Sequence, residues 1–367
     1  MFSNNNQISR RQTFRLFTFD LMGISLLIVP AYLARNSGVW GILSIVFGIL
    51  LGLGYIGLLY WLSRRFPGDL LEGIKTGLPT WGKDLILFWL VFHCVLIAGF
   101  GGFVFGDLMK ESLIPDQSYI LILIILFLVA GYAVSGGIES RGRVYEIAFW
   151  FVLIPLAIML FFAGREMQAE HFVPAEKFQW NMLFSGGYLV FMMETPLFFG
   201  AFFRKYLPSG EKKKGIFSCM LPALLLSGAF LLVEYVVLLG NFGGNSLASM
   251  SYPAVTLMNT VQFSGSFVKR LDALMLGVWF FTLFALLNLF LFHGAEFLKA
   301  LTEPQEEKKK EKRLYLVTVL VMAAVLALIF AYLPKTREWF YGYIWYVGTP
   351  LTVLIPVILG IWKGRQK

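Results

Sequence analysis

The chain has 367 residues, of which 58% are hydrophobic and only 14% are charged. A soluble domain carries about 25% charged residues, so this composition excludes a protein whose only solvent is water and indicates that most of the chain lies in lipid. The formal net charge of +9 would also suit a protein that binds nucleic acid, but the basic residues gather in alternate connectors between apolar stretches.

Ten apolar stretches follow one another along the chain, each close to the roughly 20 residues that a helix needs to cross a bilayer. Only short polar breaks separate them, so residues 1–367 are expected to form a single integral membrane domain. The predicted spans are 13–34, 39–62, 84–108, 118–138, 144–163, 180–203, 215–240, 271–297, 314–333 and 342–362. No short apolar region with a cleavage site precedes the first span, which is therefore expected to remain as an anchor.

The basic residues indicate how these spans are oriented. With the N-terminus in the cytoplasm, the cytoplasmic segments hold 23 of the 31 Lys and Arg residues and the opposite side holds 8. Cytoplasmic loops of membrane proteins carry the excess of basic residues, so both termini are predicted to face the cytoplasm. The basic character therefore reflects topology, and we expect no nucleic-acid partner. The charged loops 204–214 and 303–313 are expected to be solvated and to contact anionic lipid or a partner domain.

The ten spans divide into two halves of five, about 10–163 and about 179–362. Because five is odd, the second half must enter the membrane in the opposite orientation, which predicts an inverted repeat. Transporters of this kind bind their ligands near the bilayer midplane, at discontinuous helices in corresponding positions of the two halves. The predicted fold class is therefore an all-α membrane protein of about ten transmembrane helices, with helices one and six discontinuous.

Spans one and six both contain residues that disrupt helices. Gly23 lies near the middle of span one, where glycine costs about 1 kcal/mol, and Pro196 in span six removes an intrahelical hydrogen bond. Unwound backbone is tolerated in lipid only where it lines a cavity or meets a ligand. Helix N-termini attract a carboxylate and free carbonyls accept from an ammonium, so we expect a zwitterion such as an amino acid to bind here. The predicted ligand-binding residues are Gly23, Ile24, Ser25, Gly187, Tyr188, Phe191, Glu194 and Thr195. The alternative is that the glycines only allow close helix packing.

Four ionisable side chains inside the spans require an explanation, because each costs about 2.5–3.5 kcal/mol on insertion scales. Glu194 is expected to pair with the ligand amine or to act as a protonatable switch, unless it is a structural acid. Asp20 either holds a cation or proton near an inner gate or pairs with Arg15. Glu234 is either a proton carrier or a neutral, hydrogen-bonded acid. His93 is either a titrating group or a packing residue.

The outer side of the membrane carries two further features. Asp272, near the outer interface, is a candidate gate residue or the partner of Arg270 in an ion pair. The connector 241–269 is long, and its Tyr252-Pro253 followed by the apolar run 254–258 predicts a short helix that covers the pocket as a lid.

No pattern in the sequence indicates catalysis. Cys94 and Cys219 lie inside spans without metal or redox spacing, and we find no nucleophile elbow, phosphate loop, metal cluster or carboxylate pair with catalytic spacing. We therefore expect no enzymatic activity, no cofactor and no metal.

Two blocks of residues carry a resemblance that covers nearly the whole chain. The first consists of Ile8-Ser9, Gln12, Gly23 and Pro30, and the second of Tyr252-Pro253, Val268-Lys269-Arg270-Leu271-Asp272-Ala273 and Trp279. The chain thereby resembles the spore germination permeases, the B subunits of nutrient germinant receptors within the amino acid-polyamine-organocation superfamily. That family usually has a glycine and an aromatic residue before the acid of span six. Here Met192-Met193-Glu194 keeps the acid without the glycine, which leaves open where the helix breaks.

The resemblance implies a ten-helix inverted-repeat fold, the sensing of an amino acid or related nutrient, and association with A-type and C-type receptor subunits. It also implies a place in the cell membrane or the spore inner membrane. The leading functional hypothesis is accordingly a receptor subunit that binds an amino acid between helices one and six and signals through partner subunits. A proton-coupled amino acid transporter that uses the same site is the alternative, and an ion or water conduit without an organic ligand is a third.

Overall fold

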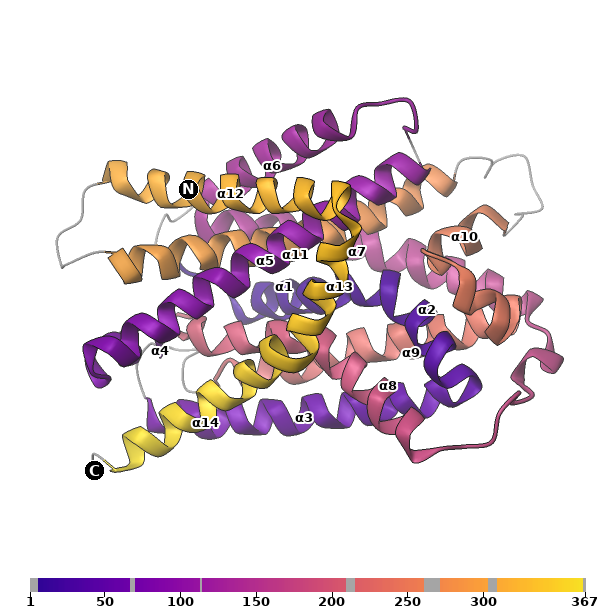
Figure 1. Cartoon of the computed structure of the whole chain (residues 1–367), viewed down its shortest axis with the longest axis horizontal. Coiled ribbons are helices and arrows are strands. Elements are labelled where there is room, and N and C mark those ends of the chain that lie inside the picture. The colour runs from indigo at the N-terminus through magenta and orange to yellow at the C-terminus, as the bar shows by residue number, and fades with distance from the viewer. Residues whose placement is uncertain are drawn as a thin grey trace.

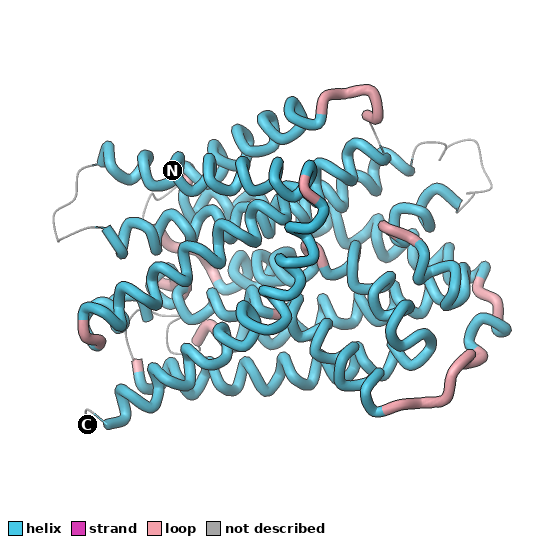
Figure 2. Tube along the Cα trace, viewed as in Figure 1, coloured by secondary structure: helices cyan, strands magenta, loops and turns pink. Residues whose placement is uncertain are grey.

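A computed structural model describes residues 6–66, 70–112, 114–208, 215–260, 271–302 and 309–365, and every regular element within these ranges is helical (Figure 2). In this described part, eight helical stretches are long and apolar enough to cross a membrane. The stretch Arg10–Arg65 contains the first two predicted spans, and the shorter apolar helix Tyr119–Ser135 lies at the fourth. A helical segment therefore lies at each of the ten predicted spans, which confirms the prediction of an all-α membrane protein. The inverted repeat stays a prediction.

The α-helices are α1 (Arg10–Met22), α2 (Ser25–Ser37), α3 (Gly41–Arg65), α4 (Leu70–Gly77), α5 (Thr80–Ser112), α6 (Tyr119–Ser135), α7 (Gly137–Ala163), α8 (Trp180–Met193), α9 (Phe217–Ser249), α10 (Pro253–Thr260), α11 (Leu271–Thr302), α12 (Lys309–Tyr332), α13 (Pro334–Tyr343) and α14 (Thr349–Arg365). Short 3₁₀ helices are η1 (Gly38–Trp40), η2 (Gly164–Glu166), η3 (Ala169–Phe172), η4 (Thr195–Phe202) and η5 (Arg204–Tyr206), and a π-helical turn, η7, covers Ile344–Gly348.

Most of the long helices run side by side along the longest axis of the molecule (Figure 1). α5 packs along α11 and α12, while α3 packs along α8 and α9. α1 and α2 run through the middle, where α1 contacts α7, α9 and α11. This arrangement surrounds the first span with other helices, and eight residues of α1 are buried.

The first span begins with a fixed N-terminus. Ser9 caps α1, because its hydroxyl accepts from the Gln12 backbone N–H at 3.2 Å while the Gln12 side chain accepts from the Ser9 N–H at 3.0 Å. Such a reciprocal capping box satisfies two of the backbone donors that a helix start leaves free. The backbone N–H of Ile8 also donates to the Tyr206 carbonyl at 2.9 Å, which ties the start of span one to the end of span six.

Both predicted helix breaks are present. α1 ends at Met22, and Gly23, with φ −28° and ψ −89°, leads into α2 at Ser25. α8 ends at Met193 and the chain continues after Glu194 as the 3₁₀ helix η4, with Pro196 in its first turn. The discontinuity of helices one and six is therefore confirmed, and the break in span six lies at Glu194.

The glycine pair of span six serves packing instead. A Cβ atom on Gly187 would lie 2.3 Å from Phe47 Cδ1, and one on Gly186 would lie 2.5 Å from Ser44 Oγ. Both neighbours belong to α3, so these glycines let α8 approach α3 closely, as small residues do between membrane helices. At this pair the packing alternative holds.

A third interruption, in span ten, was not predicted. The chain passes from α13 through the π-helical turn η7 into α14, within the stretch 342–362 that the sequence suggested as one helix. Pro350 lacks the N–H that would bond to the Tyr346 carbonyl four residues earlier, which accounts for the disturbed hydrogen-bond pattern here. Single π-turns of this kind are frequent at functional sites.

The outer connector contains the short helix that was expected, α10. It packs against α2, α9 and α11, and the Tyr252 hydroxyl just before it donates to Asp107 Oδ2 at 2.8 Å. Residues 261–270 lie outside the described part of the chain, and so does the side chain of Asp272. The gate role of Asp272 and its pairing with Arg270 therefore stay predictions.

Candidate ligand-binding site

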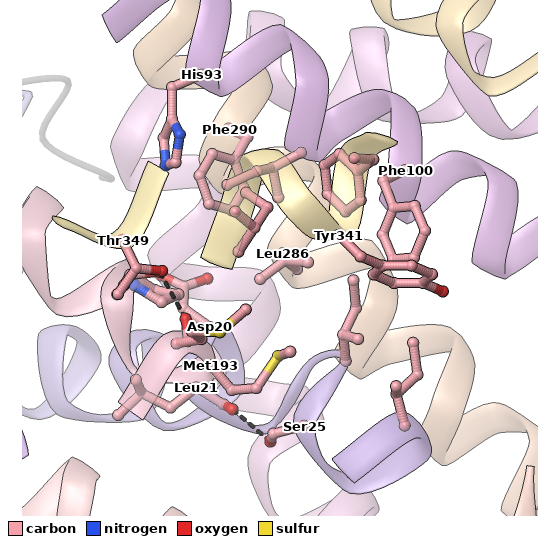
Figure 3. Close-up of a pocket in the computed structure, with 18 residues that line it drawn as sticks. Asp20, Leu21, Ser25, His93, Phe100, Met193, Leu286, Phe290, Tyr341 and Thr349 are labelled. Atoms are coloured by element: carbon pink, nitrogen blue, oxygen red, sulfur yellow. Dashed lines mark hydrogen bonds between the residues drawn. The ribbon is translucent and has the colours of Figure 1, made fainter. Parts of the chain in front are cut away.

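A cavity lies where the three interrupted spans meet (Figure 3). Its volume is about 80 Å³, several times the roughly 10–15 Å³ that one water molecule requires. Eighteen residues of α1, α2, α5, α8, η4, α11, α13, η7 and α14, together with the α1–α2 junction, line it: Asp20, Leu21, Ile24, Ser25, Ile28, His93, Ile97, Phe100, Met192, Met193, Thr195, Pro196, Leu286, Phe290, Phe340, Tyr341, Ile344 and Thr349. The sequence prediction that a site forms between spans one and six thus has a cavity at the corresponding place, with span ten as an additional wall.

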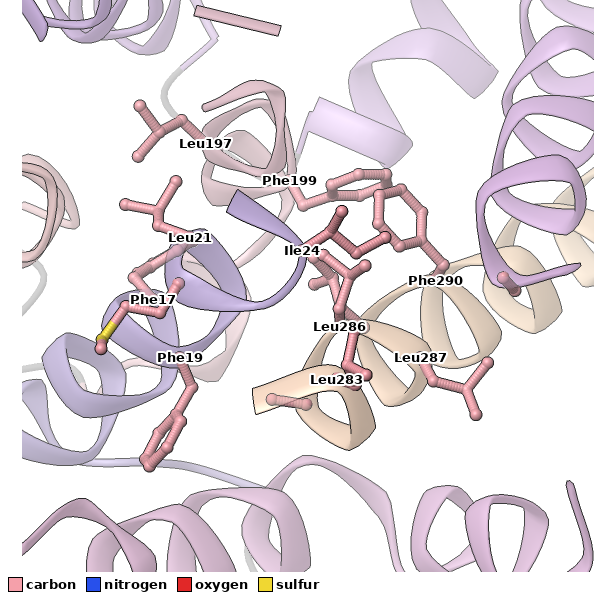
Figure 4. Packing of buried hydrophobic residues seen from close by; sticks show 14 of the residues in the cluster. Phe17, Phe19, Leu21, Ile24, Leu197, Phe199, Leu283, Leu286, Leu287 and Phe290 are labelled. Carbon is pink, nitrogen blue, oxygen red and sulfur yellow. The ribbon is translucent and has the colours of Figure 1, made fainter. Parts of the chain in front are cut away.

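The wall of this cavity is mostly apolar. Ile24, at the break in span one, gathers with Leu286 and Phe290 of α11 and with Phe199 of η4 (Figure 4). Gly23 makes this arrangement possible, because a Cβ atom there would lie 3.0 Å from Leu286 Cβ and 3.3 Å from the Thr282 carbonyl oxygen. The glycine therefore both breaks the helix and lets the broken end lie against α11.

Two hydroxyl groups in the cavity satisfy carbonyls at the helix breaks. The Ser25 hydroxyl donates to the Leu21 carbonyl at 2.6 Å, and the Thr195 hydroxyl donates to the Met192 carbonyl at 2.8 Å. A hydroxyl that donates in this way retains its acceptor lone pairs. Ser25 and Thr195 can therefore still accept a hydrogen bond from a ligand.

Two further polar groups lack a partner within the described residues. Thr349, at the start of α14, is 1% exposed and its Oγ1 forms no hydrogen bond there. His93 of α5 has its Nδ1 3.2 Å from the Tyr343 hydroxyl, while its buried Nε2 is unpartnered in the same part of the chain. Buried polar groups are nearly always hydrogen-bonded, so these two are available to a ligand.

The sole acidic residue among those that line the cavity is Asp20, which is 1% exposed. Arg141 of α7 donates from Nη2 to Asp20 Oδ1 at 3.1 Å and to Oδ2 at 3.5 Å. The alternative that Asp20 pairs with Arg15 is wrong, because the Arg15 guanidinium lies 3.6 Å from Glu146 Oε1 instead. The sequence did not single out Arg141, since the fifth span was predicted to start at residue 144, whereas α7 starts at Gly137.

Several predicted site residues lie outside the cavity. Glu194 is buried, and a Cβ atom on Gly52 of α3 would lie 2.0 Å from its Oε2. The structure thus directs this carboxylate toward α3 and away from the cavity that the sequence assigned to it. Glu234 of α9 is fully buried, lines no part of this cavity, and its two oxygens form no hydrogen bond within the described residues.

The other aromatic and glycine positions of span six are also occupied by helix packing. The Tyr188 hydroxyl donates to the Trp345 carbonyl of η7 at 2.7 Å, and Phe191 packs edge-on against Tyr55 with ring centroids 5.5 Å apart. Gly187 faces α3, as described above for the helix pair. Of the twelve residues named from the sequence, Asp20, Ile24, Ser25, His93 and Thr195 line the cavity.

The sequence pattern of one protein family, described as "Spore germination protein", matches residues 7–338. The chain belongs to this family. The resemblance that the sequence carried is thereby confirmed, and the protein is a spore germination protein of the membrane-embedded, permease type.

Three relatives from Bacillus subtilis (strain 168) are similar to this spore germination protein at low identity. Spore germination protein B2 is 22% identical, with 99% of this chain and 96% of the relative covered. Spore germination protein A2 is 22% identical over 78% and 82% of the two chains, and spore germination protein KB is 20% identical over 98% and 96%.

A solved structure shares the fold. A Na⁺-coupled sialic acid symporter in its substrate-bound outward-open state matches with a TM-score of 0.68 at 12% identity, covering 95% of this chain and 78% of that chain. At this identity the likeness shows the fold alone. Family and fold together point to an integral membrane protein with a receptor or permease role in spore germination, rather than to an enzyme.

Proposed function

We propose that this spore germination protein binds an amino acid, or a similar small nutrient, in the cavity between the breaks of helices one and six. Binding shifts a conformational equilibrium, and A-type and C-type receptor subunits read the shift. The observation that supports the proposal is the cavity itself, which lies against both helix breaks and holds unpartnered polar groups within an apolar wall. A ligand acts in this way only if its affinity differs between the two conformations.

The ends of the broken helices suit a zwitterion. Ile24, at the N-terminal cap of the 13-residue helix α2, makes no side-chain hydrogen bond to the helix, so the first N–H groups of α2 have no side-chain cap. These groups and the positive end of the helix dipole attract a carboxylate. The acceptors that an ammonium needs are the Asp20 carboxylate and the Ser25 and Thr195 hydroxyls.

The apolar wall favours amino acids with hydrophobic side chains. Ile28, Ile97, Phe100 and Phe290 offer only carbon atoms to the space that a side chain would fill. A charged side chain would be left without partners there, which costs far more than the burial of an apolar group contributes. We therefore propose that leucine-like and valine-like ligands bind more tightly than acidic or basic ones.

A proton-coupled transporter is the second candidate, and the fold shared with a Na⁺-coupled symporter favours it. The two functions differ in outcome at the same site. A receptor needs only to bind and change conformation, whereas a transporter must release its ligand on the other side.

Binding and uptake measured in parallel on the same preparation test the proposal. Purified protein is titrated with each amino acid, and the protein in liposomes is supplied with radiolabelled ligand. We expect saturable binding of apolar amino acids, lost in Ile97→Trp, which fills the cavity, and kept in Phe92→Trp, which changes a lipid-facing position of the same helix that is 37% exposed. Binding without uptake supports a receptor, uptake supports the transporter, and no binding of any amino acid contradicts both.

A further inference from the structure

We infer that Asp20 receives the ammonium group of the ligand and that Arg141 is the positioning residue that keeps this carboxylate charged and in place. The inference rests on the proposed function, since it names the residues that recognise one group of the proposed ligand. It assigns a role to Arg141, which lies on α7 and is not part of the cavity wall.

Asp20 is the acceptor best placed for a cation. It alone among the residues that line the cavity carries a carboxylate, and the carboxylates of Glu194 and Glu234 lie elsewhere. The Asp20 and Arg141 side chains are 0% and 1% exposed, so water does not compensate their charges. An isolated carboxylate in such surroundings would take up a proton and become neutral. Arg141 supplies the opposite charge that allows Asp20 to stay ionised.

The geometry of the ion pair leaves room for a second cation. Both contacts to Asp20 come from a single nitrogen, Arg141 Nη2, at 3.1 and 3.5 Å. An ionised carboxylate has about four acceptor positions, so an ammonium can bind from the cavity without displacing the guanidinium. A charge-assisted hydrogen bond of this kind is about twice as strong as one between neutral groups, which makes the site selective for an amine.

Arg141 itself is held on the side of Asp20 that faces α7. Its guanidinium carbon lies 5.9 Å from the centre of the Tyr145 ring one turn along the helix. The Tyr145 hydroxyl in turn accepts from the Asn288 amide at 3.4 Å. The carboxylate is thus fixed between the cavity and a polar group on the opposite side, and its direction does not depend on the ligand.

Folding does not explain the pair equally well. A buried ion pair is often no more stabilising than apolar residues of the same size, because both charges lose their hydration. α1 is also attached to α7 independently of Asp20, since Glu146 accepts from the Gln12 side chain at 2.9 Å and pairs with Arg11 and Arg15. Loss of the Asp20–Arg141 pair therefore leaves other contacts to hold the two helices together.

The test compares two ligands that differ only in the amino group. The tightest-binding amino acid found for the wild type and the 2-hydroxy acid with the same side chain are titrated into purified wild-type protein, Asp20→Asn, Arg141→Lys, Arg141→Met and the control Glu146→Gln. Glu146 lies at the same α1–α7 contact but not in the cavity. We expect the wild type, Arg141→Lys and Glu146→Gln to prefer the amino acid by about tenfold or more, in line with a hydrogen bond to a charged group. In Asp20→Asn and Arg141→Met this preference falls to about twofold or less.

A wild-type preference in Asp20→Asn would overturn the role of Asp20, and the same result in Arg141→Met would overturn the role of Arg141. If Arg141→Met does not fold, Asp20→Asn/Arg141→Met, which leaves no unpaired charge, is measured instead. We expect that double variant to bind both ligands alike, and a retained preference would again refute the inference. If the wild type binds amino acids but the variants keep their preference, only this inference fails. If the wild type binds none, the proposed function fails and the inference falls with it.

Discussion

The polar residues of the cavity fall into those that pair with the protein and those that wait for a ligand. Asp20, Ser25 and Thr195 have protein partners, whereas Thr349 and one nitrogen of His93 have none in the described part of the chain. Sequence reasoning found Asp20 and His93 because an ionisable group in lipid is costly. It missed Thr349, because a threonine in an apolar span carries no such cost and no pattern marked its helix as interrupted.

Thr349→Val is expected to lower the affinity for the amino acid about five- to tenfold, the size of one neutral hydrogen bond. Thermal stability should stay unchanged or rise, because the variant removes a buried hydroxyl that has no partner among the described residues. Titration and a melting curve on the same sample measure both. Thr352→Val is the control, since that hydroxyl donates to the Thr349 carbonyl at 2.7 Å and lies outside the cavity. Wild-type affinity in Thr349→Val would show that the hydroxyl does not contact the ligand.

Among the helices, glycine has two different uses that the sequence alone does not separate. Gly23 breaks span one, and Gly186 and Gly187 leave α8 intact and let it approach α3. The difference depends on the neighbouring helix, whose side chains fill the space over the glycine pair. The position of the second break, at Glu194 before Pro196, follows from proline chemistry, and the twin-glycine signal only confused it.

Gly48→Ala is expected to destabilise the protein by about 1–3 kcal/mol, as overpacking in a close contact does. A Cβ atom there would lie 2.5 Å from Val190 Cβ and 2.9 Å from the Gly187 carbonyl oxygen, neither of which can rotate away. Gly54→Ala, in the same helix with nothing within 4 Å, is the matched control and should leave stability unchanged or slightly raised. Equal melting temperatures for both variants would refute the close packing of α3 on α8.

At the scale of the whole molecule, hydropathy and charge predicted most of the architecture. The ten apolar stretches all became helices, because a chain in lipid must satisfy its backbone hydrogen bonds within each span. The pairing of helices could not be predicted in the same way. Asp20 and Arg141 lie 121 positions apart in the sequence, and only the packing of α1 across α7 brings them together.

The predicted topology has a direct test in intact cells. A membrane-impermeant maleimide should label Glu170→Cys, in the exposed outer connector, and should label Lys213→Cys only after the membrane is opened. The two native cysteines, Cys94 and Cys219, are buried, so they add little background. Labelling of Lys213→Cys from outside would reverse the orientation derived from the basic residues.

The central claim, that an amino acid occupies the cavity between the broken helices, is tested most directly by protection of a cysteine placed in its wall. Ile97 lines the cavity and is half-buried, so Ile97→Cys should react slowly with a small thiol reagent. We predict that the tightest-binding amino acid slows this reaction with the same concentration dependence as its binding, and that the rate for Glu170→Cys does not change. An unchanged rate for Ile97→Cys at a saturating ligand concentration would contradict the account.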